Sequence, residues 1–402
     1  MSWNLSKLGD NCTITSSRRF HLDERKKEGV PFYSSKEVIQ LCNGESITDC
    51  QYISDEAYED VKCRFGVPKE NDLLLTTRGT SGIPYLYRSS DKFYFSDGNL
   101  TWFKDFGESL DSKFLYYWFK SSEGWGKVDS IAKGTAQKAV PIDALKDLEI
   151  PLPPLPIQRR IADILSAYDD LIENNQRQIK LLEEAAMRLY REWFVFMRFP
   201  GHESVRIEDG VPEGWEKKKV SSIMKFVKGK NLGDVSFEKL DGYEKLLLLD
   251  GLESDVTTYA CAEKQVLAKD GDILMLMDGA RSSHTFITDA GIVGSTLSLI
   301  EITENQIPVS YVKGYFDANL NLFVNNNTGS AIPHANRKFI EGSDILIPNL
   351  QLLENYDNIS GVFLKRVRSL NHMNQQLRIS RDALLPRLMN GGEGLKLEGG
   401  AV

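Results

Sequence analysis

The longest regular pattern in the chain is a seven-residue repeat of apolar positions between residues 157 and 194. This segment contains neither proline nor glycine. An apolar residue at every seventh position lies on one side of an α-helix, so the spacing predicts a long helix with an apolar stripe. The repeated positions are Leu165, Ile172, Ile179, Ala186 and Trp193.

A second seven-residue ladder begins 198 residues later, at Phe363, Leu370, Leu377 and Leu384. It predicts another long helix, which Pro386 and the glycines after it would end. Because each helix is apolar on one stripe alone, the economical arrangement is an antiparallel, coiled-coil-like pair. A coiled coil with another chain stays open as an alternative. Asn174 and Asn175 in the seam are interpreted as residues that set the register of the pair.

The regions that precede the two helices repeat each other in order. Four kinds of segment recur: a buried strand with a glycine turn, an aromatic helix-like segment, a loop of small residues and a strand before proline. Four segments in one order at offsets of 195 to 200 residues indicate an internal duplication. They are residues 72–79 and 272–279, 113–119 and 310–316, 134–136 and 329–331, and 148–151 and 345–348.

These patterns predict an α+β fold with a pseudo-twofold internal repeat, in which two long antiparallel helices separate two strand-rich domains. The 402-residue length also favours more than one domain. The expected division is a strand-rich domain at 1–151, a helix at 152–198, a strand-rich domain at 199–348, a helix at 349–390 and a flexible tail at 391–402.

Composition limits the class of protein. The chain is 41% hydrophobic and 26% charged, as in folded proteins, and its net charge is −8. Such a charge argues against a protein that coats nucleic acid by itself. Residues 217–230 hold six lysines and no acidic residue, which indicates a local positive stripe or simply a solvated face. No long apolar run or secretory signal pattern is present, so we expect a cytoplasmic protein without a membrane partner.

Signatures of catalysis are missing from the sequence. We find no phosphate-binding Gly-x-x-x-x-Gly-Lys loop, no Gly-x-Gly-x-x-Gly turn, no Gly-x-Ser-x-Gly elbow and no Asn-Pro-Pro-Tyr motif of DNA amino-methyltransferases. The five histidines are scattered and form no spacing typical of a metal site. We therefore expect neither catalytic residues nor a metal in this chain.

One stretch carries a family resemblance. Residues 149–165, EIPLPPLPIQRRIADIL, resemble the start of the helical region in specificity (S) subunits of type I restriction-modification systems. Residues 188–194, 199–202 and 211–215 resemble the same family's passage from that helix to its second target-recognition domain, and residues 384–389 resemble the end of its second helix. In the second half, residues 347–353 depart from the proline-rich pattern.

The resemblance implies a non-catalytic DNA reader. Two target-recognition domains would each read one half of a bipartite, asymmetric site in double-stranded DNA. Methyltransferase (M) subunits would dock on the helices, restriction/translocase (R) subunits would join them, and S-adenosylmethionine, ATP and Mg would belong to these partners. The alternative is a coiled-coil adaptor that does not itself read DNA.

Candidate DNA contacts lie in the repeated loops and beside the repeated strands. The loops at 133–138 and 329–338 combine small residues with donors and amides, and a glutamine can bond an adenine edge twice. Basic residues after the repeated strands and after the tryptophans that open each half are typical of rim and phosphate contacts. In each case a merely solvated side chain is the alternative. The predicted residues are Arg18, Arg19, Arg78, Lys133, Gln137, Lys138, Lys228, Lys230, Arg281, His334, Asn336, Arg337 and Lys338.

Large aromatic residues close the first helix pattern. Tyr190, Trp193 and Phe194 lie near the end of the predicted helix, where they could pack in a core or bind a partner. Core packing is the favoured interpretation, and we name the three residues as the candidates for partner binding, specifically docking of the methyltransferase subunit.

Overall fold

The computed structural model describes residues 3–45, 47–134, 138–232, 234–248, 257–329 and 332–390. The chain divides into two compact units: unit 1 comprises Met1–Glu173 with Leu377–Val402, and unit 2 comprises Asn174–Gln376. Each unit therefore holds one strand-rich region and a part of each long helix. The expected flexible tail, 391–402, lies outside the described residues.

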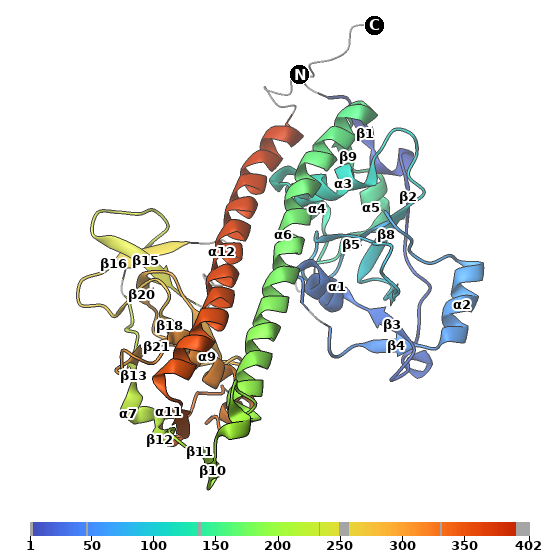
Figure 1. Cartoon of the computed structure of the whole chain (residues 1–402). Coiled ribbons are helices and arrows are strands. Elements are labelled where there is room, and N and C mark those ends of the chain that lie inside the picture. Colours follow the sequence, from blue (N-terminus) through green and yellow to red (C-terminus); the bar gives the residue numbers. More distant parts are fainter. Residues whose placement is uncertain are drawn as a thin grey trace, which may run out of the picture. The chain divides into compact units, whose positions relative to one another are not determined.

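Two long helices, α6 (Leu155–Tyr190) and α12 (Leu350–Met389), take part in both units (Figure 1). Pro156 stands in the first turn of α6, where a missing N–H is tolerated. A π-helical turn, Arg191–Val195, continues from α6. Helix α12 runs through Pro386, which lies in its last turn.

Unit 1 is built on a four-stranded antiparallel sheet with the order β2 (Thr13–Thr15), β8 (Leu100–Lys104), β5 (Leu73–Thr76) and β6 (Pro84–Leu86). A second sheet has the order β4 (Gln51–Ile53), β3 (Val30–Tyr33) and β7 (Tyr94–Phe95), and β1 (Leu5–Lys7) pairs with β9 (Glu149–Pro151). The helices are α1 (Ser35–Cys42), α2 (Asp55–Arg64), α3 (Ser112–Lys120), α4 (Ser122–Ile131) and α5 (Ile142–Lys146), with short 3₁₀ turns at Leu8–Asp10 and Leu22–Glu24.

Unit 2 has a four-stranded antiparallel sheet with the order β13 (Met224–Lys228), β21 (Leu297–Ile302), β18 (Ile273–Leu276) and β19 (Thr285–Ile287). Its second sheet has the order β14 (Val235–Ser236), β16 (Thr258–Cys261), β15 (Tyr243–Leu247), β20 (Gly291–Val293) and β17 (Leu267–Ala268). Two strand pairs are β10 (Ile207–Glu208) with β11 (Val211–Pro212), and β12 (Glu216–Lys219) with β22 (Asp344–Ile347). The helices are α7 (Val220–Ile223), α9 (Val309–Ala318), α10 (Leu320–Asn325) and α11 (Arg337–Gly342), with a 3₁₀ turn at His202–Ser204.

The two units share one strand topology. The central strand β5 pairs with β8 and β6 as β18 pairs with β21 and β19, and all four pairings are antiparallel. In the second sheets, β3 and β7 form a parallel pair, as do β15 and β20. The duplication that the sequence predicts is therefore present in the hydrogen-bonded framework of both units.

The core of unit 1 includes parts of both long helices. Phe114 and Trp118 of α3 are fully buried, and they share one cluster with Ile161 and Leu165 of α6 and Leu388 of α12. An amphipathic helix is stable when its apolar stripe is covered, and α3 supplies that cover here. The long helices accordingly contribute side chains to the core of this unit.

Asp169 of α6 links three helices within unit 1. The Tyr117 hydroxyl of α3 donates to its Oδ2 at 2.8 Å, and the Arg381 guanidinium of α12 donates to its Oδ1. Lys120 Nζ lies 3.7 Å from the same carboxylate. Burial alone would raise the pKa of Asp169, but Lys120, Arg381 and Tyr117 hold it below its ordinary value.

A buried amide pair joins the two helices within unit 2. Asn175 Nδ2 of α6 donates to Asn374 Oδ1 of α12 at 2.8 Å, and both side chains are buried. Fifteen residues further along α6, Tyr190 contacts Tyr356, which precedes Asn374 on α12. The two helices are therefore antiparallel in this unit. Asn175 makes the kind of contact expected of a register residue, whereas Asn174 is exposed.

We predict that the amide pair acts as a unit in stability. Asn175→Leu leaves the Asn374 amide buried without its partner and should lower the free energy of unfolding by about 1–3 kcal/mol. Asn175→Leu combined with Asn374→Leu removes both polar groups and should recover most of that loss. Urea unfolding of the full chain measures both, with the exposed Asn174→Leu as control. A double variant less stable than the single one contradicts the prediction.

Candidate nucleic-acid interface

A short loop lies beside the end of strand β5 in unit 1. Arg78, two residues after β5, forms a β-bridge with Ala139, which also bridges Lys133. The Lys133 N–H donates to the Ala139 carbonyl at 2.8 Å, and the Ala139 N–H donates back at 2.9 Å. Gly79 has a φ of +76°, and a Cβ at this position would meet nothing within 4 Å. The turn is therefore open, and we call Arg78, Lys133, Lys138 and Ala139 the unit 1 rim.

Two basic side chains of the unit 1 rim are available for a ligand. Arg78 and Lys133 are exposed and pair with no carboxylate of the described residues. Lys138 Nζ lies 2.6 Å from Asp129 Oδ1, so its charge is already partly balanced. Gln137, the predicted base-reading amide, lies outside the described residues.

Unit 2 repeats this backbone framework with different side chains. Asp278, two residues after β18, bridges His334, which also bridges Thr328. The His334 N–H donates to the Thr328 carbonyl at 2.7 Å, and the Thr328 N–H donates back at 2.9 Å. Gly279 repeats the positive φ of the first unit, at +102°. We call Lys228, Asp278, Thr328 and His334 the unit 2 rim.

The Asp278 carboxylate joins two of the predicted DNA contacts. His334 Nδ1 lies 2.7 Å from its Oδ1, and Lys228 Nζ lies 3.4 Å from its Oδ2. Sequence reasoning selected Lys228 and His334 but missed Asp278. The internal repeat could have identified Asp278, because it aligns residues 72–79 with 272–279 and so makes Asp278 the equivalent of Arg78.

Helix α11 carries three further predicted contacts. Asn336 caps the helix, because its Oδ1 accepts the Phe339 N–H at 3.2 Å. Arg337 Nε lies 2.7 Å from Glu341 Oε1 on the same helix. Lys338 is exposed and pairs with no carboxylate in the described part of the chain. Of the three, Lys338 has the side chain that is most free to reach a phosphate.

The predicted basic residues after the first strands occupy equivalent positions. The registers of β2 on β8 and of β13 on β21 align Arg18 with Lys230. Arg18 Nη2 lies 2.7 Å from Glu24 Oε1, and Lys230 Nζ donates to the Lys264 carbonyl at 2.6 Å. Both side chains therefore have partners within their own unit.

Two other predicted arginines also have local partners. Arg19 Nε lies 2.7 Å from Asp97 Oδ2, although most of the Arg19 side chain is exposed. The Arg281 guanidinium lies 5.4 Å from the centre of the Phe286 ring, within cation–π distance.

The lysine stripe at 217–230 is largely neutralised. Lys217 and Lys219 both pair with Asp344 on the neighbouring strand, and Lys218 pairs with Glu304. These contacts favour the interpretation of this stripe as a solvated strand face rather than a phosphate track.

Tyr190, Trp193 and Phe194 are buried in the core of unit 2. Phe194 lies edge-on to Tyr311 and Tyr356, with ring centres 4.9 Å apart in both pairs. Burial raises the pKa of Tyr190 well above its ordinary value. Core packing, the interpretation favoured from the sequence, therefore accounts for these side chains. Enclosed by their own unit, they offer little surface for docking a partner.

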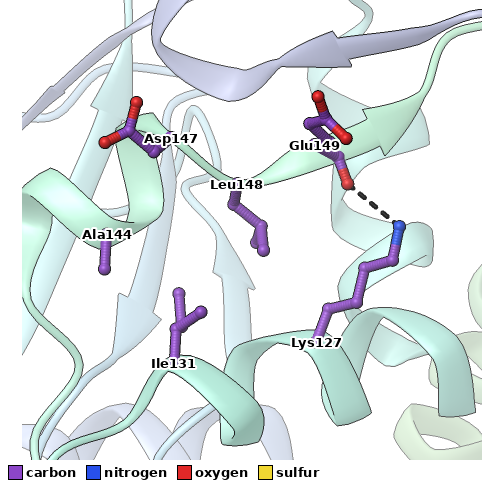
Figure 2. Close-up of a pocket in the computed structure, with 6 residues that line it drawn as sticks. All are labelled: Lys127, Ile131, Ala144, Asp147, Leu148 and Glu149. Atoms are coloured by element: carbon purple, nitrogen blue, oxygen red, sulfur yellow. Dashed lines mark hydrogen bonds between the residues drawn. The ribbon is translucent and has the colours of Figure 1, made fainter.

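Unit 1 has a shallow pocket. Figure 2 shows its lining residues, which come from α4, α5, the connection after α5 and the start of β9, with Lys127 Nζ donating to the Glu149 carbonyl at 3.0 Å. None of the residues that line it is a predicted DNA contact. Among the described residues, no three His, Cys, Asp or Glu side chains gather in a way that could hold a metal ion. No helix in the same residues is long and apolar enough to span a membrane.

Comparisons with known proteins agree with this architecture. Residues 1–184 match the family described as "Type I restriction modification DNA specificity domain". The MjaIX type I restriction enzyme specificity subunit of Methanocaldococcus jannaschii is 24% identical, over 97% of this chain and 93% of its own length. The MjaVIII specificity subunit of the same organism is 27% identical over 44% of each chain. By these similarities the chain resembles the specificity subunits of type I restriction-modification systems.

The fold of a solved specificity subunit is also similar. The crystal structure of a type I S subunit from M. genitalium superposes with a TM-score of 0.62 at 16% sequence identity, covering 96% of both chains. At this identity the likeness concerns the fold alone. It agrees with a fold built from two strand-rich regions and two long helices.

We predict that Phe194 stabilises the chain without any partner. Phe194→Ala removes a buried ring from the aromatic cluster and should lower the free energy of unfolding by about 3–5 kcal/mol. Phe196→Ala, which truncates a half-exposed ring two residues away, is the matched control and should cost much less. Denaturant unfolding of the purified chain decides between them. If both variants are equally stable, Phe194 does not stabilise the core and remains a candidate for docking a partner.

Proposed function

We propose that this chain is a specificity subunit that reads a bipartite, asymmetric DNA site, with the rim of unit 1 on one half-site and the rim of unit 2 on the other. The observation that carries the proposal is one backbone framework, built twice, with different side chains at equivalent rim positions. Arg78 and Ala139 in unit 1 correspond to Asp278 and His334 in unit 2. Identical readers would suit a symmetric site, whereas different readers suit an asymmetric one.

The partners in this proposal are double-stranded DNA, methyltransferase subunits and restriction/translocase subunits. A chain of net charge −8 has little general attraction for phosphates, so many of the contacts to the DNA backbone would come from the partner subunits. S-adenosylmethionine, ATP and Mg would be bound by those subunits, and this chain would contribute sequence recognition and assembly.

Domain replacement tests the assignment of one half-site to each unit. We predict that replacing residues 1–151 with the corresponding region of a relative of known specificity changes one half of the methylated sequence and leaves the other half unchanged. The measurement is methylome sequencing of a host that expresses the chimera with its methyltransferase subunit. A change in both halves contradicts independent readers.

An adaptor that does not itself read DNA is the competing function. A gel shift of a duplex library, with and without the co-expressed methyltransferase subunit, separates the two. A reader shifts a subset of sequences that changes when unit 1 is replaced, whereas an adaptor leaves the selected sequences to its partner. If the complex with the chimera shifts the same sequences as the wild-type complex, the adaptor function is supported.

We predict that Lys338 contacts a phosphate. Lys338→Gln in the complex should weaken binding to all sequences to a similar extent and reduce the slope of log affinity against log salt by about 1. Lys7→Gln is the matched control, because Lys7 lies on β1 and is already paired with Asp147 at 2.8 Å. Binding isotherms at several salt concentrations measure the slope. An unchanged slope for Lys338→Gln places this side chain away from DNA.

A further inference from the structure

The rims of the two units differ at one pair of positions that touch each other. Position 78 bridges position 139 in unit 1 as position 278 bridges position 334 in unit 2. Arg78 faces an alanine, which has no polar side chain to hold it. Asp278 faces His334, and these two side chains are hydrogen-bonded at 2.7 Å. A repeated backbone therefore carries a single long donor in unit 1 and a coupled acid–imidazole pair in unit 2.

The carboxylate determines which ring nitrogen of His334 carries a proton. An ionised carboxylate only accepts hydrogen bonds, so the Nδ1 that contacts it must donate. In the neutral ring, Nε2 then has no proton and is an acceptor. The His334 side chain is about half exposed, at 48%. The ring is thus held by one edge while a large part of it remains accessible.

Lys228 supports the same carboxylate from the other side. Its Nζ lies 3.4 Å from Asp278 Oδ2, whereas His334 uses Oδ1. With a cation on one oxygen and the ring on the other, the carboxylate has little freedom to rotate. Groups held in this way recognise a base edge better than a mobile side chain, because less conformational entropy is lost on binding.

We propose that Asp278 is a positioning residue that fixes His334 as a hydrogen-bond acceptor for one base of the half-site read by unit 2. The inference rests on the proposed function and names the residue pair that carries its specificity in this unit. In the major groove an acceptor at Nε2 pairs with an exocyclic amino group, on adenine N6 or cytosine N4. At the equivalent position of unit 1, Arg78 donates directly and suits the O6 and N7 acceptors of guanine.

The test uses the full chain in complex with its methyltransferase subunit and a duplex library randomised in both half-sites. For Asp278→Ala and for His334→Ala we expect discrimination to fall by about 5- to 150-fold at one base pair, the same one for both variants. The other half-site should be unchanged. Arg78→Ala should show the reverse pattern, with its loss confined to the half-site of unit 1.

Two further variants separate positioning from a structural role. In Asp278→Asn the amide can donate to Nδ1, which moves the ring proton to Nε2 and should shift the preferred base from adenine or cytosine to guanine or thymine. Asp278→Ala combined with His334→Ala should lose no more discrimination than His334→Ala alone, because Asp278 acts through the ring. Additive losses overturn the positioning role.

A matched control is Asp344→Ala. Asp344 also pairs with two lysines, Lys217 and Lys219, but it lies on β22 and belongs to neither rim. It should leave every base preference unchanged. If the wild-type complex selects no bipartite sequence, the proposed function itself fails. If it selects one, and the Asp278 and His334 variants weaken all sequences equally or affect different base pairs, this inference alone is overturned.

Discussion

The fold depends on covering the apolar stripe of each long helix. A helix with one apolar stripe gains most of its stability in a protein from the packing of that stripe. In unit 1 the cover comes from α3, whose Phe114 and Trp118 contact the same core as Ile161 and Leu165 of α6. In unit 2 the aromatic cluster around Phe194 does the same for the end of α6. The helices and the strand-rich regions therefore stabilise each other.

Polar groups inside these interfaces add selectivity to the packing. Asp169 in unit 1 is partly buried, the Asn175–Asn374 pair in unit 2 is buried, and each has a partner from the other long helix. A buried polar group that loses its partner costs more than an apolar contact that shifts. A slip of one helix along the other is thereby penalised more strongly than apolar side chains alone would allow.

The sequence predicted the features that repeat and missed those that depend on distant partners. Seven-residue spacing sufficed for α6 and α12, and ordered repetition sufficed for the shared strand topology. The short strands of the second sheets have no comparable period. Asp278 was overlooked because its partners, Lys228 and His334, lie about fifty residues away on either side. Likewise, the sequence favoured core packing for Phe194 but could not name its neighbours, Tyr311 and Tyr356, which lie more than a hundred residues away.

The division of both helices between the two units has a consequence for inheritance. A recognition region that is exchanged by recombination between residues 1 and 151 brings a new α3, but it leaves behind the segments of α6 and α12 on which α3 packs. The proposed sites of DNA contact are free to diverge in such an exchange, whereas the inner face of α3 is not. Each recognition region should therefore have a rim whose residues change rapidly and an inner face whose shape is conserved. Only regions that share this inner face can be exchanged without loss of packing.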